Sequence, residues 1–137
     1  MADYTKPLPI IGQPNRELWD GCKAGEIRLQ KCEDCGQFRY PPSPLCRQCL
    51  SLKSTWMKSK GTGTVFSYVV YHQAFHKGFQ EEIPYIVALI DLEEGVRLVS
   101  RIKNCPIEAV SIGMKVSAIF EPATDELTLP FFEPVKD

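Results

Sequence analysis

Four of the six cysteines form two identical pairs, Cys32-x-x-Cys35 and Cys46-x-x-Cys49, separated by ten residues. Each pair can supply two neighbouring corners of a tetrahedron, and two such turns joined by a short hairpin complete a shell of four thiolates. The spacing therefore predicts a Cys₄ metal site with Cys32, Cys35, Cys46 and Cys49 as ligands. Zinc is the expected metal. Iron suits the same ligand set, and two disulfides are a further alternative.

A shell closed by four thiolates leaves no coordination position for water or substrate, whereas catalytic zinc keeps one open. We therefore expect a structural Zn²⁺ ion rather than a catalytic one. Gly36 follows the first pair and suits a tight turn, because glycine adopts positive φ at little cost. Leu50 stands at the equivalent place after the second pair. This departure predicts a less regular second turn with the same ligands.

The composition of this 137-residue chain, 44% hydrophobic and 24% charged, is typical of one mid-sized globular domain or two very small ones. Its net charge of −1 hides an asymmetry. Residues 1–60 carry ten basic and six acidic side chains, and residues 61–137 carry six and eleven. No segment approaches the roughly 20 apolar residues that span a bilayer. We expect a cytoplasmic protein with reduced thiols, which favours a metal over disulfides.

The first segment, residues 1–25, is expected to be an arm and a short helix. Three prolines, at positions 7, 9 and 14, favour an extended conformation over residues 1–13. A helix over 14–24 would start at Pro14 and stop at Gly25. One face of it carries Leu18, Trp19 and Cys22. Trp19 either anchors the helix by packing or belongs to a ligand or partner surface.

The second segment, residues 26–60, is the expected zinc ribbon. The run EIRLQKC alternates, with Ile27 and Leu29 on one side, and Phe38 and Tyr40 share a side after the first cysteine pair. About 35 residues cannot bury much apolar surface. The metal is therefore expected to supply the missing stability, and the ribbon is expected to unfold without it.

The third segment, residues 61–137, contains five runs rich in β-branched and aromatic residues: TVFSYVVYH, PYIVALIDL, VRLVSRI, GMKVSAIFE and ELTLPFFE. Gly61-Thr62-Gly63 is expected to redirect the chain between two small cores. A long connection follows the first run, and a short insert, 106–111, separates the third from the fourth. The pattern predicts a mainly β protein whose C-terminal part is a five-stranded OB-fold barrel.

No residue pattern proposes a reaction centre. Cys22 and Cys105 are best explained as small packing residues, and His72 and His76 lie beside a loop that is a poor helix candidate. The chain has no phosphate-cradling glycine loop, no Ser/His/Asp signature and no dinucleotide fingerprint. The alternative that stays open is an independent enzyme that uses one of these cysteines or the histidine pair.

OB barrels and zinc ribbons commonly bind single-stranded nucleic acid, which makes such a module the alternative function. The acidic barrel segment opposes contact with a polyanion. Five aromatic residues of the barrel are expected in its core: Phe66, Tyr68, Tyr71, Tyr85 and Phe120. The basic residues gather on the ribbon side. They form either a solvated face or a site for an acidic partner or a small anion, since a phosphate group needs only two or three converging cations.

The order of several motifs resembles one family over about residues 14–134. These motifs are LWDGCKAGEIRLQKCEDCG, a downstream PP-x-P-x-C-x-x-C, GTGTVFSYVVYH, IPYIVALIDLEEGVRL, SIGMKVSAIFE and LPFFEP. The chain is similar to the zinc-ribbon/OB-fold proteins once grouped as a domain of unknown function and now called acyl-CoA-associated. The resemblance implies a non-catalytic accessory subunit of lipid metabolism. Its expected partner is a thiolase-like enzyme: an acyltransferase, thiolase or aldolase.

The resemblance also implies how such a subunit works. Relatives accompany enoyl-CoA hydratases, assist a thiolase-like aldolase in steroid side-chain degradation, or bridge a thiolase and a hydroxymethylglutaryl-CoA synthase around a shared CoA passage. By similarity, this chain would bind acyl-CoA and dock on its enzyme as part of a hetero-oligomer, without nucleic acid or membrane. Arg39 and Arg47 are the candidate contacts for the CoA phosphates.

Overall fold

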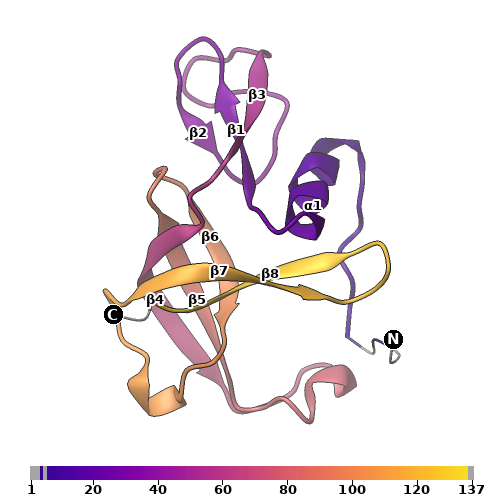
Figure 1. Cartoon of the computed structure of the whole chain (residues 1–137), viewed down its shortest axis with the longest axis vertical. Helices are drawn as coiled ribbons and strands as arrows, with labels where there is room; N and C mark the ends of the chain where they lie inside the picture. Colours follow the sequence, from indigo (N-terminus) through magenta and orange to yellow (C-terminus); the bar gives the residue numbers. More distant parts are fainter. Residues whose placement is uncertain (1–3, 5, 136–137) are drawn as a thin grey trace.

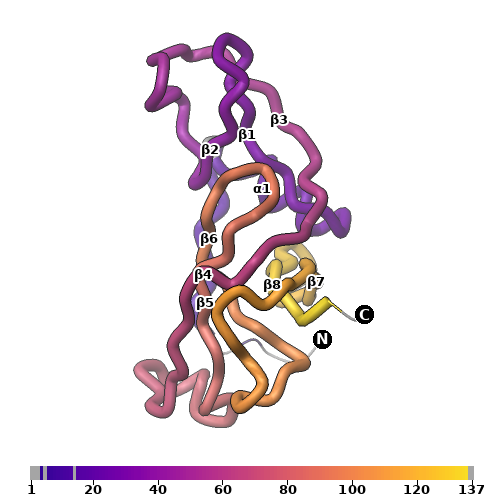
Figure 2. The backbone as a smooth tube through the Cα atoms, turned by 90° about the vertical axis from the view of Figure 1, so that its left-hand side faces the viewer, coloured from indigo at the N-terminus to yellow at the C-terminus, as the bar shows by residue number. Residues whose placement is uncertain are grey.

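The computed structural model describes Tyr4 and residues 6–135 of the chain. Two β units lie one above the other along its long axis, with a helix beside their junction (Figure 1). The upper unit is a small ribbon, and the lower unit is a barrel. Figure 2 shows that the turn between two strands of the barrel, β5 (Tyr85–Leu92) and β6 (Arg97–Ile102), rises toward the ribbon.

The ribbon is a three-stranded antiparallel sheet in the order β2-β1-β3. Its strands are β1 (Arg28–Cys32), β2 (Phe38–Arg39) and β3 (Ser54–Lys58). The pairing of Cys32 with Ser54 fixes the register at the end of β1, where the first cysteine turn begins. The predicted zinc ribbon is confirmed.

The lower unit is a closed five-stranded barrel in the order β4-β5-β6-β8-β7. Its strands are β4 (Thr62–Tyr71), β5 (Tyr85–Leu92), β6 (Arg97–Ile102), β7 (Lys115–Pro122) and β8 (Thr128–Pro134). The ring closes where β6 meets β8 in parallel, with Ile102 opposite Phe132. Short 3₁₀ turns lie in the two connections noted in the sequence: η2 (Lys77–Phe79) before β5, and η3 (Ile107–Ala109) before β7. The predicted OB-fold barrel is confirmed.

The helical segment comprises a 3₁₀ turn, η1 (Gln13–Asn15), followed by α1 (Arg16–Lys23). Gly25 adopts a φ of +84° just beyond the helix, as expected of a glycine stop. Helix α1 packs against β1 of the ribbon and β8 of the barrel. Leu18 and Cys22 are buried in this junction, and Trp19 is half-buried, with its indole Nε1 enclosed. The helix therefore joins the two β units.

The expectation of two separate small cores is wrong. Ile27 and Leu29 of the ribbon belong to the same buried cluster as Val65 and Phe132 of the barrel. A sheet of three short strands cannot cover its own apolar side chains, so they find cover against the barrel. Gly61 turns the chain with a φ of +74°, as expected, but Gly63 lies inside β4. The domain limits 1–25, 26–60 and 61–137 stay a prediction.

The expectation for the barrel aromatics is partly wrong. Tyr68 and Phe120 pack against the core, as predicted. Phe66 is 47% exposed on the outside of the barrel, at a register shift in the pairing of β4 with β5. Tyr71 and Tyr85 stack on each other outside the core, with ring centroids 5.1 Å apart. The strands that carry these residues are apolar on both faces, so the sequence alone does not separate inward from outward side chains.

The described part of the N-terminal arm runs along the barrel before it reaches η1 (Figure 1). The Lys6 ammonium donates to the Glu82 carboxylate in the connection before β5, at 2.5 Å. Residues 1–3 and 5 of the predicted arm lie outside the described residues. Among the residues that the structure describes, no helix has the length and apolar character needed to cross a bilayer.

Candidate functional site

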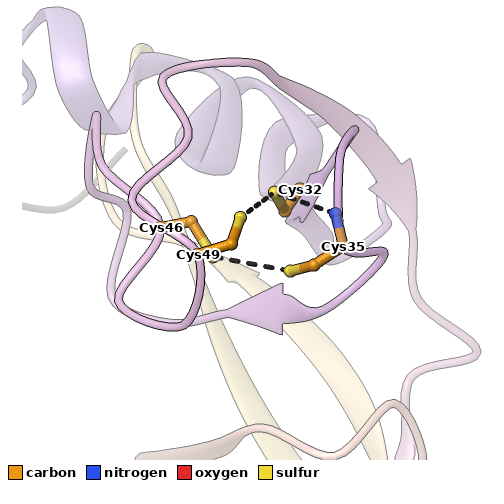
Figure 3. Close-up of side chains that lie close together, drawn as sticks. All are labelled: Cys32, Cys35, Cys46 and Cys49. Carbon is orange, nitrogen blue, oxygen red and sulfur yellow. Dashed lines mark hydrogen bonds between the residues drawn. The ribbon is translucent and has the colours of Figure 1, made fainter.

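The four cysteines of the two pairs meet at the end of the ribbon (Figure 3). All four sulfur atoms lie within 4.8 Å of one another. The Sγ atoms of Cys32 and Cys49 are 3.5 Å apart, and those of Cys35 and Cys46 are 3.6 Å apart. Zinc–sulfur bonds of about 2.3 Å in a tetrahedron place the sulfurs roughly 3.8 Å apart. The thiols are free, so the cluster fits a structural Zn²⁺ ion.

The two cysteine turns have the same backbone geometry. In the first, Gly36 N–H donates to the Cys32 carbonyl at 3.0 Å, and in the second, Leu50 N–H donates to the Cys46 carbonyl at 2.9 Å. Gly36 has a φ of +78°, and Leu50 has a φ of +65°. The expectation of a less regular second turn is therefore wrong, because Leu50 adopts the left-handed conformation that glycine normally supplies.

Backbone amides prepare part of the cluster for a cation. The N–H of Cys35 points at the Cys32 sulfur and is the main cause, with the N–H of Asp34 and the neighbouring thiols, that lowers the pKa of Cys32 to about 6 against the effect of burial. The N–H groups of Cys49 and Gln48 lower the pKa of Cys46 in the same way. The N–H of Ser51 also favours the Cys49 thiolate, but hydrogen bonds with the other thiols and burial outweigh it and raise the pKa of Cys49 to about 12. A bound Zn²⁺ would favour the thiolate form of all four.

Cys22 and Cys105 lack the environment of a nucleophile. Cys22 is fully buried, and burial raises its pKa to about 12. Burial also raises the pKa of Cys105. His72 and His76 are exposed, and His76 Nδ1 accepts the N–H of Gly78 in the η2 turn at 3.0 Å. These surroundings favour packing and loop roles, in line with the expectation from the sequence.

Arg39 and Arg47 line one cleft of about 530 Å³ between the ribbon and the barrel. A third arginine, Arg97, joins them from the start of β6. Glu94 lies in the turn between β5 and β6 and holds that turn near the ribbon. Its carboxylate accepts hydrogen bonds from the Ser59 hydroxyl and the Lys60 N–H, both at 2.8 Å. The sequence did not indicate Arg97, since it lies 50 positions after Arg47 in the chain and the two residues line the same cleft only through the tertiary fold.

The three arginines have different bonding states. Arg39 donates through Nε and Nη2 to the Ser43 carbonyl, at 2.9 and 2.6 Å, and its Nη1 is enclosed without a partner among the described residues. Arg97 forms a pair of hydrogen bonds with Asp91 and lies over the Phe66 ring. Arg47 is exposed, and no ion pair within the described residues involves it. Arg47 thus has donors open to an anion, and Arg39 keeps one donor without an acceptor, the enclosed Nη1.

The other ribbon cations do not join this cleft. Arg28 pairs with Glu17 and Glu26 beside α1, and the Lys31 ammonium lies 5.5 Å from the Phe38 ring centroid. Of the basic residues on the ribbon side, Arg39 and Arg47 therefore converge on the cleft, whereas Arg28 and Lys31 interact elsewhere.

Comparison with known proteins identifies both units. The model of the ChsH2 rubredoxin-like zinc ribbon domain matches residues 19–53, and that of the ChsH2 C-terminal OB-fold domain matches residues 56–121. A DUF35 domain-containing scaffold protein of Methanothermobacter thermautotrophicus is 33% identical over 97 residues, which cover 70% of this chain and 72% of the relative. The chain belongs to this DUF35/ChsH2 family. The resemblance inferred from the sequence motifs is confirmed.

Two further relatives are informative. The probable enoyl-CoA hydratase alpha subunit of Thermomonospora curvata is 38% identical over 129 residues, but the chain spans only 40% of that relative's length. A chain of the solved Ltp2-ChsH2(DUF35) aldolase superposes with a TM-score of 0.84 and 37% identity, covering 93% of this chain and 98% of that one. The match to a rubredoxin-like ribbon also supports the structural zinc ion expected from the cysteine spacing.

Proposed function

We propose that this chain is a non-catalytic subunit that binds acyl-CoA and docks on a thiolase-like enzyme: an acyltransferase, thiolase or aldolase. The observation that carries the proposal is its likeness, over nearly the full length of both chains, to a chain of a solved aldolase whose name joins two proteins. The scaffold and hydratase-subunit names of other relatives agree with a role inside an assembly.

The cleft between ribbon and barrel is the proposed site for the CoA phosphates. The enclosed Nη1 of Arg39 lacks an acceptor, and the exposed Arg47 lines the same cleft. Phosphate oxygens are strong acceptors for guanidinium groups, and arginine binds them through two parallel hydrogen bonds. Arg97 is engaged with Asp91, so we assign it to the cleft wall rather than to the phosphates.

The partner enzyme would supply the chemistry in this proposal. The described residues offer two histidines on an exposed loop and two cysteines whose surroundings favour the thiol form. The contribution of this chain is positional: the zinc fixes the ribbon, the ribbon and barrel form the cleft, and the cleft orients the nucleotide end of the CoA.

The test is a two-step experiment. A tagged chain is purified from its native host, the co-purifying enzyme is identified, and the complex is titrated with acyl-CoA by calorimetry. We expect a thiolase-fold enzyme, and we expect Arg39→Ala and Arg47→Ala to weaken acyl-CoA binding by about tenfold each. Lys115→Ala, an exposed cation on the barrel, is the matched control and should leave binding unchanged. Full enzymatic turnover by the isolated chain, or unaltered acyl-CoA affinity in both arginine variants, would contradict the proposal.

Binding of single-stranded nucleic acid is the second candidate. On the outside of the barrel, Arg101 lies over Tyr85 and Lys103 over Phe131, at 4.5 Å from each ring centroid. Stacked cations and rings on this part of an OB barrel are typical of strand-binding proteins. Both cations are, however, already neutralised, Arg101 by Glu82 and Lys103 by Glu121. A salt-dependent gel shift with single-stranded DNA or RNA would favour this candidate over the first.

A further inference from the structure

The second cysteine turn exposes three leucines to solvent. Leu45 is 40% exposed, Leu50 is 68% exposed and Leu52 is 75% exposed. Backbone bonds hold them on one turn, since Cys46 N–H donates to the Ser51 carbonyl and Leu50 N–H donates to the Cys46 carbonyl. We call these three residues the leucine turn. Singly exposed leucines are ordinary, but three within residues 45–52 concentrate exposed apolar side chains on one short segment, and this needs an explanation.

Leu50 gains little within its own chain for an unfavourable conformation. Its φ of +65° lies in the left-handed region, where the Cβ atom approaches the following carbonyl oxygen. Gly36 occupies the equivalent place in the first turn without that strain. A strained residue persists when something else compensates for it. The hydrogen-bonded cysteine turn imposes this φ on whichever residue stands there. Because the Leu50 side chain is 68% exposed, burial inside this chain does not account for a leucine in place of glycine, and a contact outside the chain would.

The charges around the leucine turn indicate what would cover it. Lys53 directly follows Leu52, whereas Arg47, between the two cysteines, is already assigned to the CoA phosphates in the cleft. Residues 26–60 as a whole carry seven basic and three acidic side chains. One of the acids, Asp34, already accepts a hydrogen bond from Ser51 across the two turns. A complementary surface is therefore apolar at its centre and acidic at its rim.

We propose that the leucine turn inserts into an apolar pocket with an acidic rim on the enzyme partner. This inference rests on the proposed function, because it names the docking surface of the same subunit. The zinc cluster fixes the turn before binding, so little conformational entropy is lost on association. Nucleic acid would use the cations but would leave the leucines in water, so a protein surface fits better.

The variant Leu50→Gly distinguishes an effect on folding from an effect on docking, because we expect it to raise stability and to lower affinity for the enzyme. In the full-length, zinc-loaded chain it removes the strain, so the urea midpoint of unfolding should rise. It also removes the docking side chain, so affinity for the co-purified enzyme should fall by about tenfold or more. Leu52→Ser should lower affinity with the urea midpoint unchanged. Ile112→Ser, also 68% exposed but on the barrel, is the matched control and should change neither.

The stability and the enzyme affinity of the Leu50 and Leu52 variants decide whether the leucine turn is a docking surface. A lower urea midpoint for Leu50→Gly would show that Leu50 serves its own fold, and it would overturn the inference without any partner. Unchanged enzyme affinity in both leucine variants would also overturn it, while leaving the proposed function intact. If the wild-type chain bound no enzyme, the proposed function would fail and the docking surface with it. Weaker binding at high salt in the wild-type complex would support the acidic rim.

Discussion

At the scale of single residues, the two cysteine turns show how one backbone geometry can carry different costs. Gly36 and Leu50 both have positive φ, but only glycine adopts that conformation freely. We predict that Gly36→Leu lowers the free energy of unfolding by about 1 to 2 kcal/mol. A Cβ atom there would meet only the Lys31 Cε atom, at an ordinary contact distance of 4.0 Å, so the loss comes from the backbone and not from a clash.

This prediction is checked by urea unfolding of the zinc-loaded protein. Gln37→Leu is the matched control, since Gln37 is the exposed neighbour and its φ is not positive. It should leave the unfolding curve in place. If Gly36→Leu were as stable as the wild type, the turn would accept any residue, and the cost assigned to Leu50 would vanish.

At the scale of elements, Gly63 lets β4 lie close to β5, because glycine has no Cβ atom. A Cβ atom at this position would lie 2.4 Å from the Asp91 carbonyl oxygen and 3.0 Å from an Ile90 methyl group. We predict that Gly63→Ala destabilises the protein by about 2 to 3 kcal/mol, because the backbone of β5 must shift. Thermal unfolding followed by circular dichroism measures the loss. Thr64→Ala, on the next position of the same strand, should cost much less.

The N-terminal arm depends on a different kind of contact. Glu82 accepts from Lys6 at 2.5 Å and from Arg101 at 2.6 Å. Burial alone would raise the pKa of the Glu82 carboxyl, but these hydrogen bonds and charges outweigh it and hold the pKa below its ordinary value of 4.5. A lowered folded-state pKa means that the contact stabilises the arm above about pH 4.5, and that this stabilisation is lost as the pH falls through the lowered value.

We therefore predict that Glu82→Gln at neutral pH loosens the arm. The backbone {1H}–15N nuclear Overhauser effects of the non-proline residues in 6–12 should fall, while those in the barrel strands stay the same. Glu81→Gln is the control, because Glu81 is exposed and lies directly before Glu82. Equal values in both variants would show that the arm is held by its packing and not by Lys6.

At the scale of the whole molecule, the success of sequence reasoning depended on the range of each interaction. The cysteine ligands and five barrel strands were predictable, because cysteine spacing and strand alternation are local patterns. The shared core was not, since it joins Ile27 and Leu29 to Val65 and Phe132 across the chain. Arg97 was missed for the same reason. The sequence predicted a less regular second turn because leucine disfavours positive φ, but the geometry of the cysteine turn imposes a positive φ on Leu50.

The shared core leads to a prediction about metal removal. Ile27 and Leu29 are 2% and 1% exposed within the cluster that also holds the barrel residues, so the base of the ribbon is anchored independently of zinc. The cysteine turns have no such anchor, because Cys35 and Cys49 are exposed and none of the four cysteine ligands belongs to that cluster. Phe38 and Tyr40, which lie between the two turns, do pack against it. Chelation of zinc under reducing conditions should therefore melt the cysteine turns within residues 32–53 and leave the barrel folded. Hydrogen exchange should show lost protection in that segment and retained protection in β4 to β8.

Cys46→Ser should reproduce this pattern of lost and retained protection, and Cys22→Ser should not. A zinc-free protein with full protection across residues 32–53 would show that the turns hold themselves without a metal.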